Sequence, residues 1–249
     1  MKSVGSVFLM RLDKFLKENG ICTRSESKKI LKNGLIKVNG EIIKNADYKV
    51  NEFVDEVRYN EQIIKYEEFV YIMLNKPAGY LSATEDARQK TILDLINGYE
   101  HKNLFPFGRL DKDSVGLVIL SNDGVLAHEL LSPKKHVDKI YYLKIDGVLD
   151  INDVEKFRSG VTLEDGTMCK SANLEILVSD KISECNVTIR EGKFHQLKRM
   201  FKAVGKEVIY LKRTQFGGVK LDENLKEGEY RLLTLDEINL LKERGVKYE

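Results

Sequence analysis

Hydrophobic residues recur with helical spacing and then with strand spacing in the first part of the chain. Residues 11–19 and 25–32 each carry an apolar helix face and end at or next to Asn-Gly. The alternating residues 35–38 and 41–43 flank Asn39-Gly40, which is a strong hairpin signal. This region therefore predicts two short helices followed by a small antiparallel sheet.

Apolar runs of strand length dominate from residue 69 onward. Buried strands are expected at 69–74 and 115–120, and a strand rich in basic and aromatic residues begins at Lys139. Weaker strand patterns lie near 161–163, 173–178, 186–190 and 207–212. Helical patterns lie at 91–97, 125–131, 151–159, 197–204 and 235–243. The polar segment 59–68 between the two regions predicts a linker.

Length and composition limit the possible classes of protein. A chain of 249 residues with 42% hydrophobic content builds one large or two modest domains. No stretch approaches the roughly 18 apolar residues of a membrane span, and the N-terminus lacks the cleavage site of a secretory leader. The cysteines are odd in number and widely spaced, at Cys22, Cys169 and Cys185, and the histidines lack ligand spacing. We therefore expect a cytoplasmic protein without a metal.

The net charge of +2 hides an uneven distribution. Residues 1–49 hold eleven Lys and Arg against five Asp and Glu, whereas the remainder holds thirty against thirty-four. A basic segment on a mildly acidic body indicates local recognition of a polyanion, because phosphate contacts dominate nucleic-acid binding. A solvated basic face is the alternative, and charge alone does not separate the two.

The most informative polar stretch spans residues 108–124. Arg109, Asp111 and Asp113 form a polar loop that leads directly into the apolar run 115–120. Catalytic groups often lie on such loops, because a buried strand fixes their geometry while the loop gives access. The same residue types also form simple turns, so spacing alone leaves both interpretations open.

This stretch resembles the signature of pseudouridine synthases, in the branch that modifies bacterial ribosomal RNA. The matching residues are Gly108-Arg109-Leu110-Asp111, Ser114, Gly116-Leu117 and Ser121-Asn122-Asp123-Gly124. An ordered match of this length is far more specific than a short motif. In that family the Asp of the motif is catalytic, so the resemblance implies that Asp111 is the catalytic residue.

Two later stretches resemble the other motifs of that family. Lys139-Ile140-Tyr141 resembles a Lys-x-Tyr motif, which implies that Tyr141 lies in the cleft and stacks on an extruded base. Residues 191–201 resemble the third motif, which assigns Lys198 as the cation that keeps Asp111 ionised. The resemblance also assigns RNA or substrate contacts to Arg109, Lys139, His195, Gln196 and Arg199.

The first region resembles the S4 RNA-binding domain. Residues 11–16, Ser25 and Val38-Asn39-Gly40 occur in matching order. Such domains contact the shape and phosphates of RNA, which implies that the second helix binds RNA through Arg24, Lys28, Lys29 and Lys32. The stretch 74–80 resembles the opening of the catalytic domain, and there Lys76 is expected to face RNA.

Together these resemblances imply an α+β fold with a small S4 domain and a catalytic domain built on a mainly antiparallel central sheet. The expected boundaries are an extension at 1–9, the S4 domain at 10–58, the linker at 59–68 and the catalytic domain at 69–249. Isomerisation of uridine oxidises nothing and transfers no group to a second molecule. No cofactor is therefore expected, and the chain carries no dinucleotide fingerprint or phosphate-binding glycine loop.

The substrate prediction depends on residues 194–200. They are closer to the subgroup that modifies 16S ribosomal RNA, where an aromatic-His-Gln run and Lys recur, than to its large-subunit relatives. We therefore expect a monomer that isomerises one uridine of 16S RNA, within a small-subunit assembly intermediate and away from membranes. Three alternatives stay open: an enzyme for 23S RNA, a noncatalytic ribosome assembly factor of S4 type, and a nucleosidase that releases free uracil.

Overall fold

The computed structural model describes residues 9–132, 135 and 137–245, so the predicted extension lies almost entirely outside the described residues. The chain divides into two compact units. The first comprises the residues up to 70 together with 97–103, and the second comprises 71–96 and everything from 104 onward. Each unit has its own hydrophobic core.

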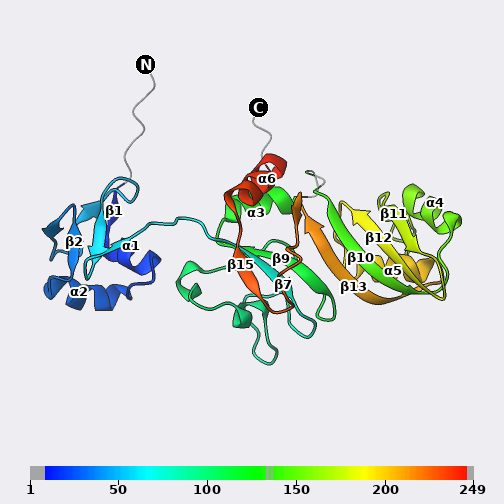
Figure 1. Cartoon of the computed structure of the whole chain (residues 1–249), viewed down its shortest axis with the longest axis horizontal. Coiled ribbons are helices and arrows are strands. Elements are labelled where there is room, and N and C mark those ends of the chain that lie inside the picture. Colours follow the sequence, from blue (N-terminus) through cyan, green and yellow to red (C-terminus); the bar gives the residue numbers. More distant parts are fainter. Residues whose placement is uncertain (1–8, 133–134, 136, 246–249) are drawn as a thin grey trace, which may run out of the picture. The chain divides into compact units, whose positions relative to one another are not determined.

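The first unit packs two helices against small sheets, as its sequence predicts (Figure 1). Its helices are α1 (Leu12–Glu18) and α2 (Arg24–Lys32). Thr23 and Glu26 form a reciprocal capping box that begins α2. The core side chains of this unit come from both helices and from the strands, and include Leu12, Phe15, Leu16, Leu31, Ile36 and Val57.

The sheet of the first unit extends beyond its predicted hairpin. The hairpin joins β2 (Ile36–Val38) to β3 (Glu41–Ile42), and its turn residues have the positive φ angles that Asn-Gly tolerates. The strand order is β3-β2-β5-β6, with β5 at Val57–Tyr59 and β6 at Gln62–Ile64. A separate pair joins β1 (Met10–Arg11) and β4 (Lys49–Val50). Most of the segment predicted as a linker, up to residue 64, is therefore a hairpin of this unit.

The second unit is built on one nine-stranded sheet within the described residues. Its main strand order is β11-β12-β10-β13-β9-β7-β15, with β14 on β13 and β8 on β9. The strands are β7 (Tyr71–Lys76), β8 (Phe105–Pro106), β9 (Val115–Ser121), β10 (Lys139–Asp146), β11 (Asn173–Val178), β12 (Ile182–Ile189), β13 (Glu207–Phe216), β14 (Val219–Lys220) and β15 (Tyr230–Leu232). Among the named strands of the described residues, β13 and β9 are the one parallel pair, so the mainly antiparallel α+β fold is confirmed.

Helices cover both halves of this sheet (Figure 1). On the β7–β9 half, α3 (Gly124–Leu131) packs beside α6 (Leu235–Gly245) over a core that includes Leu126, Phe216 and Leu241. On the other half, α5 (Gln196–Ala203) packs on β13, and α4 (Ile151–Ser159) packs on β11. The predicted helix at 91–97 is a 3₁₀ turn at Ile92–Leu95, and the predicted strand at 161–163 is a single bridge between Thr162 and Met168.

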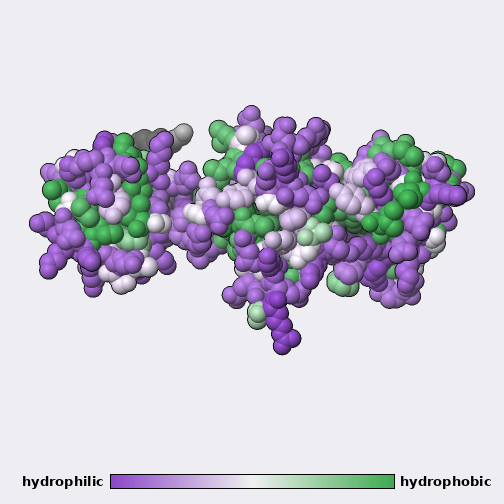
Figure 2. All heavy atoms as spheres, turned by 60° about the horizontal axis from the view of Figure 1, so that its bottom comes forward, coloured by the Kyte–Doolittle hydropathy of each residue, from purple (hydrophilic) through white to green (hydrophobic). Residues whose placement is uncertain are grey.

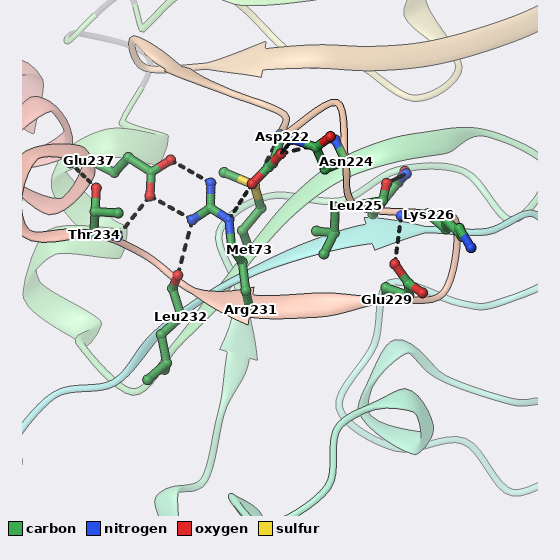
Figure 3. A network of polar contacts seen from close by, with 11 residues as sticks. Met73, Asp222, Asn224, Leu225, Lys226, Glu229, Arg231, Leu232, Thr234 and Glu237 are labelled. Carbon is green, nitrogen blue, oxygen red and sulfur yellow. Dashed lines mark hydrogen bonds and ion pairs between the residues drawn. The ribbon is translucent and has the colours of Figure 1, made fainter.

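A polar network fixes the C-terminal strand and helix (Figure 3). The Arg231 guanidinium lies 2.8 Å from an Asp222 oxygen and donates two hydrogen bonds to Glu237, at 2.8 and 2.9 Å. The bonds to Glu237 raise the pKa of Arg231 and lower that of Glu237. The Asn224 N–H and, next to it, Arg231 lower the pKa of Asp222. Because Asp222 lies between β14 and β15 while Glu237 lies in α6, one side chain joins three segments.

The visible surface is mainly hydrophilic, with hydrophobic residues in separate patches (Figure 2). Within the described residues, no helix is both long and apolar enough to cross a membrane. Hydrophobic patches of this scattered kind are ordinary on protein surfaces and require no partner to explain them.

Candidate active site

A buried lysine holds the loop that carries Asp111 through hydrogen bonds to its backbone. Lys76, at the end of β7, is fully buried, and its ammonium lies 2.7 Å from the Ser114 carbonyl oxygen and 3.1 Å from that of Asp111. The carbonyl oxygens of Pro77 and Lys112 also accept from it. Burial lowers the pKa of Lys76 to about 8. The prediction that Lys76 faces RNA is therefore wrong, because its charge is enclosed by the backbone of the loop.

Two further contacts fix the same loop. The Ser82 hydroxyl donates to the Leu110 carbonyl at 2.8 Å and accepts from the Leu110 N–H at 3.0 Å. The Gly79 N–H donates to the Lys112 carbonyl at 2.7 Å. Hydrogen bonds therefore hold the backbone before Asp111 at Leu110 and the backbone after it at Lys112. Such pairing supplies the rigidity that a reacting group requires.

The start of α5 presents a lysine and a histidine to Asp111. Lys198 Nζ lies 3.4 Å from Asp111 Oδ2, and His195 Nε2 lies 3.6 Å from Asp111 Oδ1. Lys198 also lies 2.6 Å from Asp113 Oδ1, and this hydrogen bond lowers the pKa of Asp113. The predicted pair of Asp111 and Lys198 is therefore present, but Asp113 shares the ammonium.

Strand β10 places its two adjacent tyrosines on opposite faces of the sheet. Tyr141 is 7% exposed and lines the same cleft as Asp111. The Tyr142 hydroxyl donates instead to Glu184 at 2.6 Å on the other face, and burial together with this carboxylate raises the pKa of Tyr142 to about 12. Only Tyr141 is therefore positioned to meet a group that enters the cleft.

The cleft has a volume of about 490 Å³, within the range of small-molecule sites. A smaller pocket of about 80 Å³ adjoins it and shares Asp111 and Tyr141 with it. The predicted site residues that line one or both are Arg109, Asp111, Lys139, Tyr141, His195, Gln196 and Lys198. Arg109 is exposed at this cleft, whereas Lys139 is half-buried. Burial, with the nearby Arg213 charge, lowers the pKa of Lys139 to about 8.

Two residues predicted to contact RNA have other roles. Gln196 is buried: its amide oxygen accepts from the Lys193 N–H at 2.9 Å and its amide nitrogen donates to Glu191 at 2.7 Å. It therefore braces the turn before α5. It also lines the smaller pocket, and its contact with RNA stays a prediction. Arg199 points away from the cleft and lies 2.6 Å from Asp165. The predicted basic residues of α2 are all exposed in the first unit: Arg24, Lys28, Lys29 and Lys32.

Arg213 and Lys193 line the cleft but were not among the predicted site residues. Arg213 occupies an inward position of β13, where an alternating strand ordinarily carries an apolar residue. A charged residue at an inward position of a strand is the sequence feature that could have identified Arg213 as a site residue. Within the described residues, no cluster of three or more His, Cys, Asp and Glu side chains is arranged to hold a metal ion.

Comparison with known proteins shows the family to which this chain belongs. Residues 70–203 match the family described as RNA pseudouridylate synthase, and residues 10–57 match the S4 domain. The chain belongs to the RNA pseudouridine synthase family. It is 46% identical to an uncharacterized RNA pseudouridine synthase of Bacillus subtilis, over 94% of this chain and 99% of that protein.

Two further similarities cover almost the whole chain. Ribosomal small subunit pseudouridine synthase A of Haemophilus influenzae is 39% identical over 93% of this chain and 99% of its own length. A crystal structure of a pseudouridylate synthase matches with a TM-score of 0.66 and 39% identity, over 93% of this chain and 99% of that one. Both similarities therefore span the S4 region and the synthase region of this chain.

Proposed function

We propose that this protein converts one uridine of 16S ribosomal RNA into pseudouridine. The observation that carries the proposal is the meeting of Asp111, Lys198 and Tyr141 at one cleft, from a loop, a helix and a strand far apart in the sequence. The likeness to relatives named for the small ribosomal subunit supports 16S over 23S RNA. We further propose that the enzyme is a monomer that acts in the cytoplasm. Its proposed substrate is the 16S RNA within an assembly intermediate of the small subunit.

The reaction breaks the bond between N1 and C1′, turns the uracil ring, and forms a bond between C5 and C1′. The hydrogen on C5 then leaves as a proton, and N1 takes one up, so atoms and charges balance. Neither C1′ nor both faces of the base are accessible in a stacked helix, so the nucleotide must be extruded into the cleft. The cleft beside Asp111 has the volume to receive it.

Asp111 acts on the ribose, either by adding to C1′ or by removing the proton from C2′. Both routes require an ionised carboxylate, and the Lys198 ammonium at 3.4 Å favours that form. The buried loop contacts of Lys76 and Ser82 hold Asp111 in place without touching the substrate. Both routes need an ionised Asp111 that is held in a fixed position, so the proposal includes both.

The remaining cleft residues bind the extruded nucleotide. The Tyr141 ring stacks on the uracil, and its hydroxyl is in a position to help remove the C5 proton. Arg109 is exposed at the cleft, where it contacts a phosphate or fills the gap left by the extruded base. The basic face of α2 holds flanking RNA through its phosphates.

The direct test is release of tritium from RNA that carries tritium at C5 of uridine. The wild-type protein is expected to release tritium from 16S transcripts or partly assembled subunits, and Asp111→Asn is expected to release none while still binding the RNA. Normal turnover by Asp111→Asn would refute the proposed role of Asp111. Free uracil as the main product would instead support a nucleosidase, and tight binding without tritium release would support an assembly factor.

A further inference from the structure

Arg213 is a buried cation with an unused donor. Its side chain is 1% exposed, and its Nε donates to the Leu117 carbonyl at 2.7 Å. Its Nη2 is buried and has no hydrogen-bond partner within the described residues. Leaving a buried charged donor unpaired is costly, because the group has lost its hydration without gaining a partner. Such a group indicates that a partner arrives from outside the chain.

Arg213 packs closely against strand β9 and the start of the Asp111 loop. Arg213 pairs with Gly116 where β13 and β9 run parallel, and a Cβ at Gly116 would stand 2.3 Å from the Arg213 carbonyl oxygen. Gly116 therefore allows the two backbones to approach closely at Arg213. A Cβ at Gly108 would lie 3.9 Å from Arg213 Nη1, so the start of the Asp111 loop lies next to the guanidinium.

Arg213 also lies next to the residue proposed to stack on the base. It is the direct cross-strand neighbour of Tyr141, and both line the cleft. Its guanidinium lies 5.5 Å from the centre of the Phe216 ring, so one of its faces is covered. Lys139 lines the same part of the cleft. Within the described residues, no carboxylate forms an ion pair with either Lys139 or Arg213. This end of the cleft therefore favours a negatively charged group.

We infer that Arg213 donates a hydrogen bond to a carbonyl oxygen of the uracil and stabilises the base as the glycosidic bond breaks. This inference rests on the proposed function. When the bond between N1 and C1′ breaks, its electron pair leaves with the base, and the negative charge spreads over N1, O2 and O4. The charge is consumed when C5 forms its bond to C1′. A preorganised donor aimed at developing charge is an effective catalytic device.

A base fits this donor better than a phosphate does. Nη2 is buried and the guanidinium lies over the Phe216 ring at the wall of the cleft, so a flat, neutral uracil reaches it at lower desolvation cost than a phosphodiester. The exposed Arg109 side chain is better placed for the RNA backbone. Arg213 is therefore assigned to the base, and a phosphate contact becomes an outcome of the test.

The first test compares two leaving groups under single-turnover conditions with saturating RNA. Arg213→Met is expected to slow glycosidic cleavage of the target uridine by about 10²–10³-fold. Replacing that uridine with 5-fluorouridine makes the departing base a weaker base, so the loss caused by Arg213→Met is expected to shrink by about tenfold or more. Arg213→Lys keeps the charge and the burial, and is expected to show an intermediate rate and to report on folding.

An equal loss on both substrates would show a structural role and overturn the inference. Weaker RNA binding with an unchanged rate at saturation would indicate a phosphate contact and would also overturn it. A second measurement does not depend on turnover: fluorine NMR of bound 5-fluorouracil as a function of pH. The wild type is expected to lower the pKa of the bound base, whereas Arg213→Met is not. If both proteins bind the anion equally, the inference fails even where the proposed function holds. If only the wild type prefers the anion but makes no pseudouridine, the proposed function fails instead.

Discussion

Lys198 forms its shorter contact with Asp113, at 2.6 Å, while its ammonium lies 3.4 Å from Asp111. The Asp113 side chain is 72% exposed, whereas that of Asp111 is 28% exposed. The Lys198 ammonium therefore interacts with two carboxylates, Asp111 in the cleft and Asp113 at the edge of the cleft. The negative charge of Asp113 partly cancels the positive potential that Lys198 produces at Asp111.

Asp113→Asn is expected to retain turnover within about threefold of the wild type, because the catalytic carboxylate is untouched. With Asp113 neutral, the Lys198 ammonium no longer pairs with a second carboxylate and stays available to Asp111. Asp111→Asn is the matched comparison and is expected to lose about 10³-fold or more, roughly 4 kcal/mol of barrier. Equal inactivation of both variants in single-turnover assays would contradict these roles.

Lys76→Met is expected to destabilise the synthase unit and to slow catalysis. The change leaves buried carbonyl groups of the Asp111 loop without a donor, at a cost of about 2–4 kcal/mol. Urea unfolding followed by circular dichroism measures that cost. The exposed Lys156→Met on α4 is the control, with an expected change within about 0.5 kcal/mol. A Lys76→Met protein with the stability and rate of the wild type would show that Lys76 does not hold the loop.

The basic face of α2 is expected to set RNA affinity and not the chemical step. Changing Lys28 and Lys32 to Ala should lower the salt dependence of binding by about 0.7–0.9 per lost phosphate contact. At saturating RNA the single-turnover rate is expected to stay at the wild-type value. Lys242→Ala on α6 is the control. If the double variant binds RNA with an unchanged salt slope, α2 does not form the RNA-binding face.

Lys139 is expected to reduce folding stability in a pH-dependent manner. Burial and Arg213 lower its pKa from 10.5 to about 8, against the smaller opposing effects of Asp138 and Glu191. Below a pH of about 8 the group is charged in both the folded and unfolded states, so the full burial cost is present. Between about 8 and 10.5 the unfolded chain binds more protons, so the free energy of unfolding rises with pH.

Lys139→Met removes this cost. The variant is therefore expected to be more stable than the wild type near neutral pH, with a difference that shrinks as the pH approaches 10.5. Urea unfolding of both proteins across this range measures the difference. A stability difference that stays constant with pH would contradict the assignment of a buried charge to Lys139.

Local signals in the sequence predicted most elements correctly. The Asn39-Gly40 turn and the apolar run of β9 are specified by neighbouring residues, so the hairpin and the buried strand appear as expected. The strand predicted at 207–212 continues to Phe216 as β13. The prediction ended too early because Arg213 interrupts the alternation of apolar residues. The predicted linker contains β6, which pairs with β5 across a two-residue turn at Asn60-Glu61. This turn lacks the glycine of the strong Asn-Gly signal, so the sequence did not indicate a hairpin there.

The same limit explains the site residues that differed. Polar side chains next to motifs were expected to face RNA, yet Lys76 and Gln196 are buried by partners that the fold supplies. Whether a polar residue meets solvent or backbone depends on segments distant in sequence. Asp111, Tyr141 and Lys198 were named from motif resemblance, and their roles stay predictions until turnover is measured.

The most direct measurement is chemical mapping of pseudouridine on unmodified 16S and 23S RNA, bare and partly assembled, after incubation with wild-type protein or Asp111→Asn. The account predicts one new site in 16S RNA with the wild type and none with the variant. A new site in 23S RNA would contradict the proposed substrate while keeping the chemistry. No new site in either RNA, with binding intact, would contradict the account as a whole.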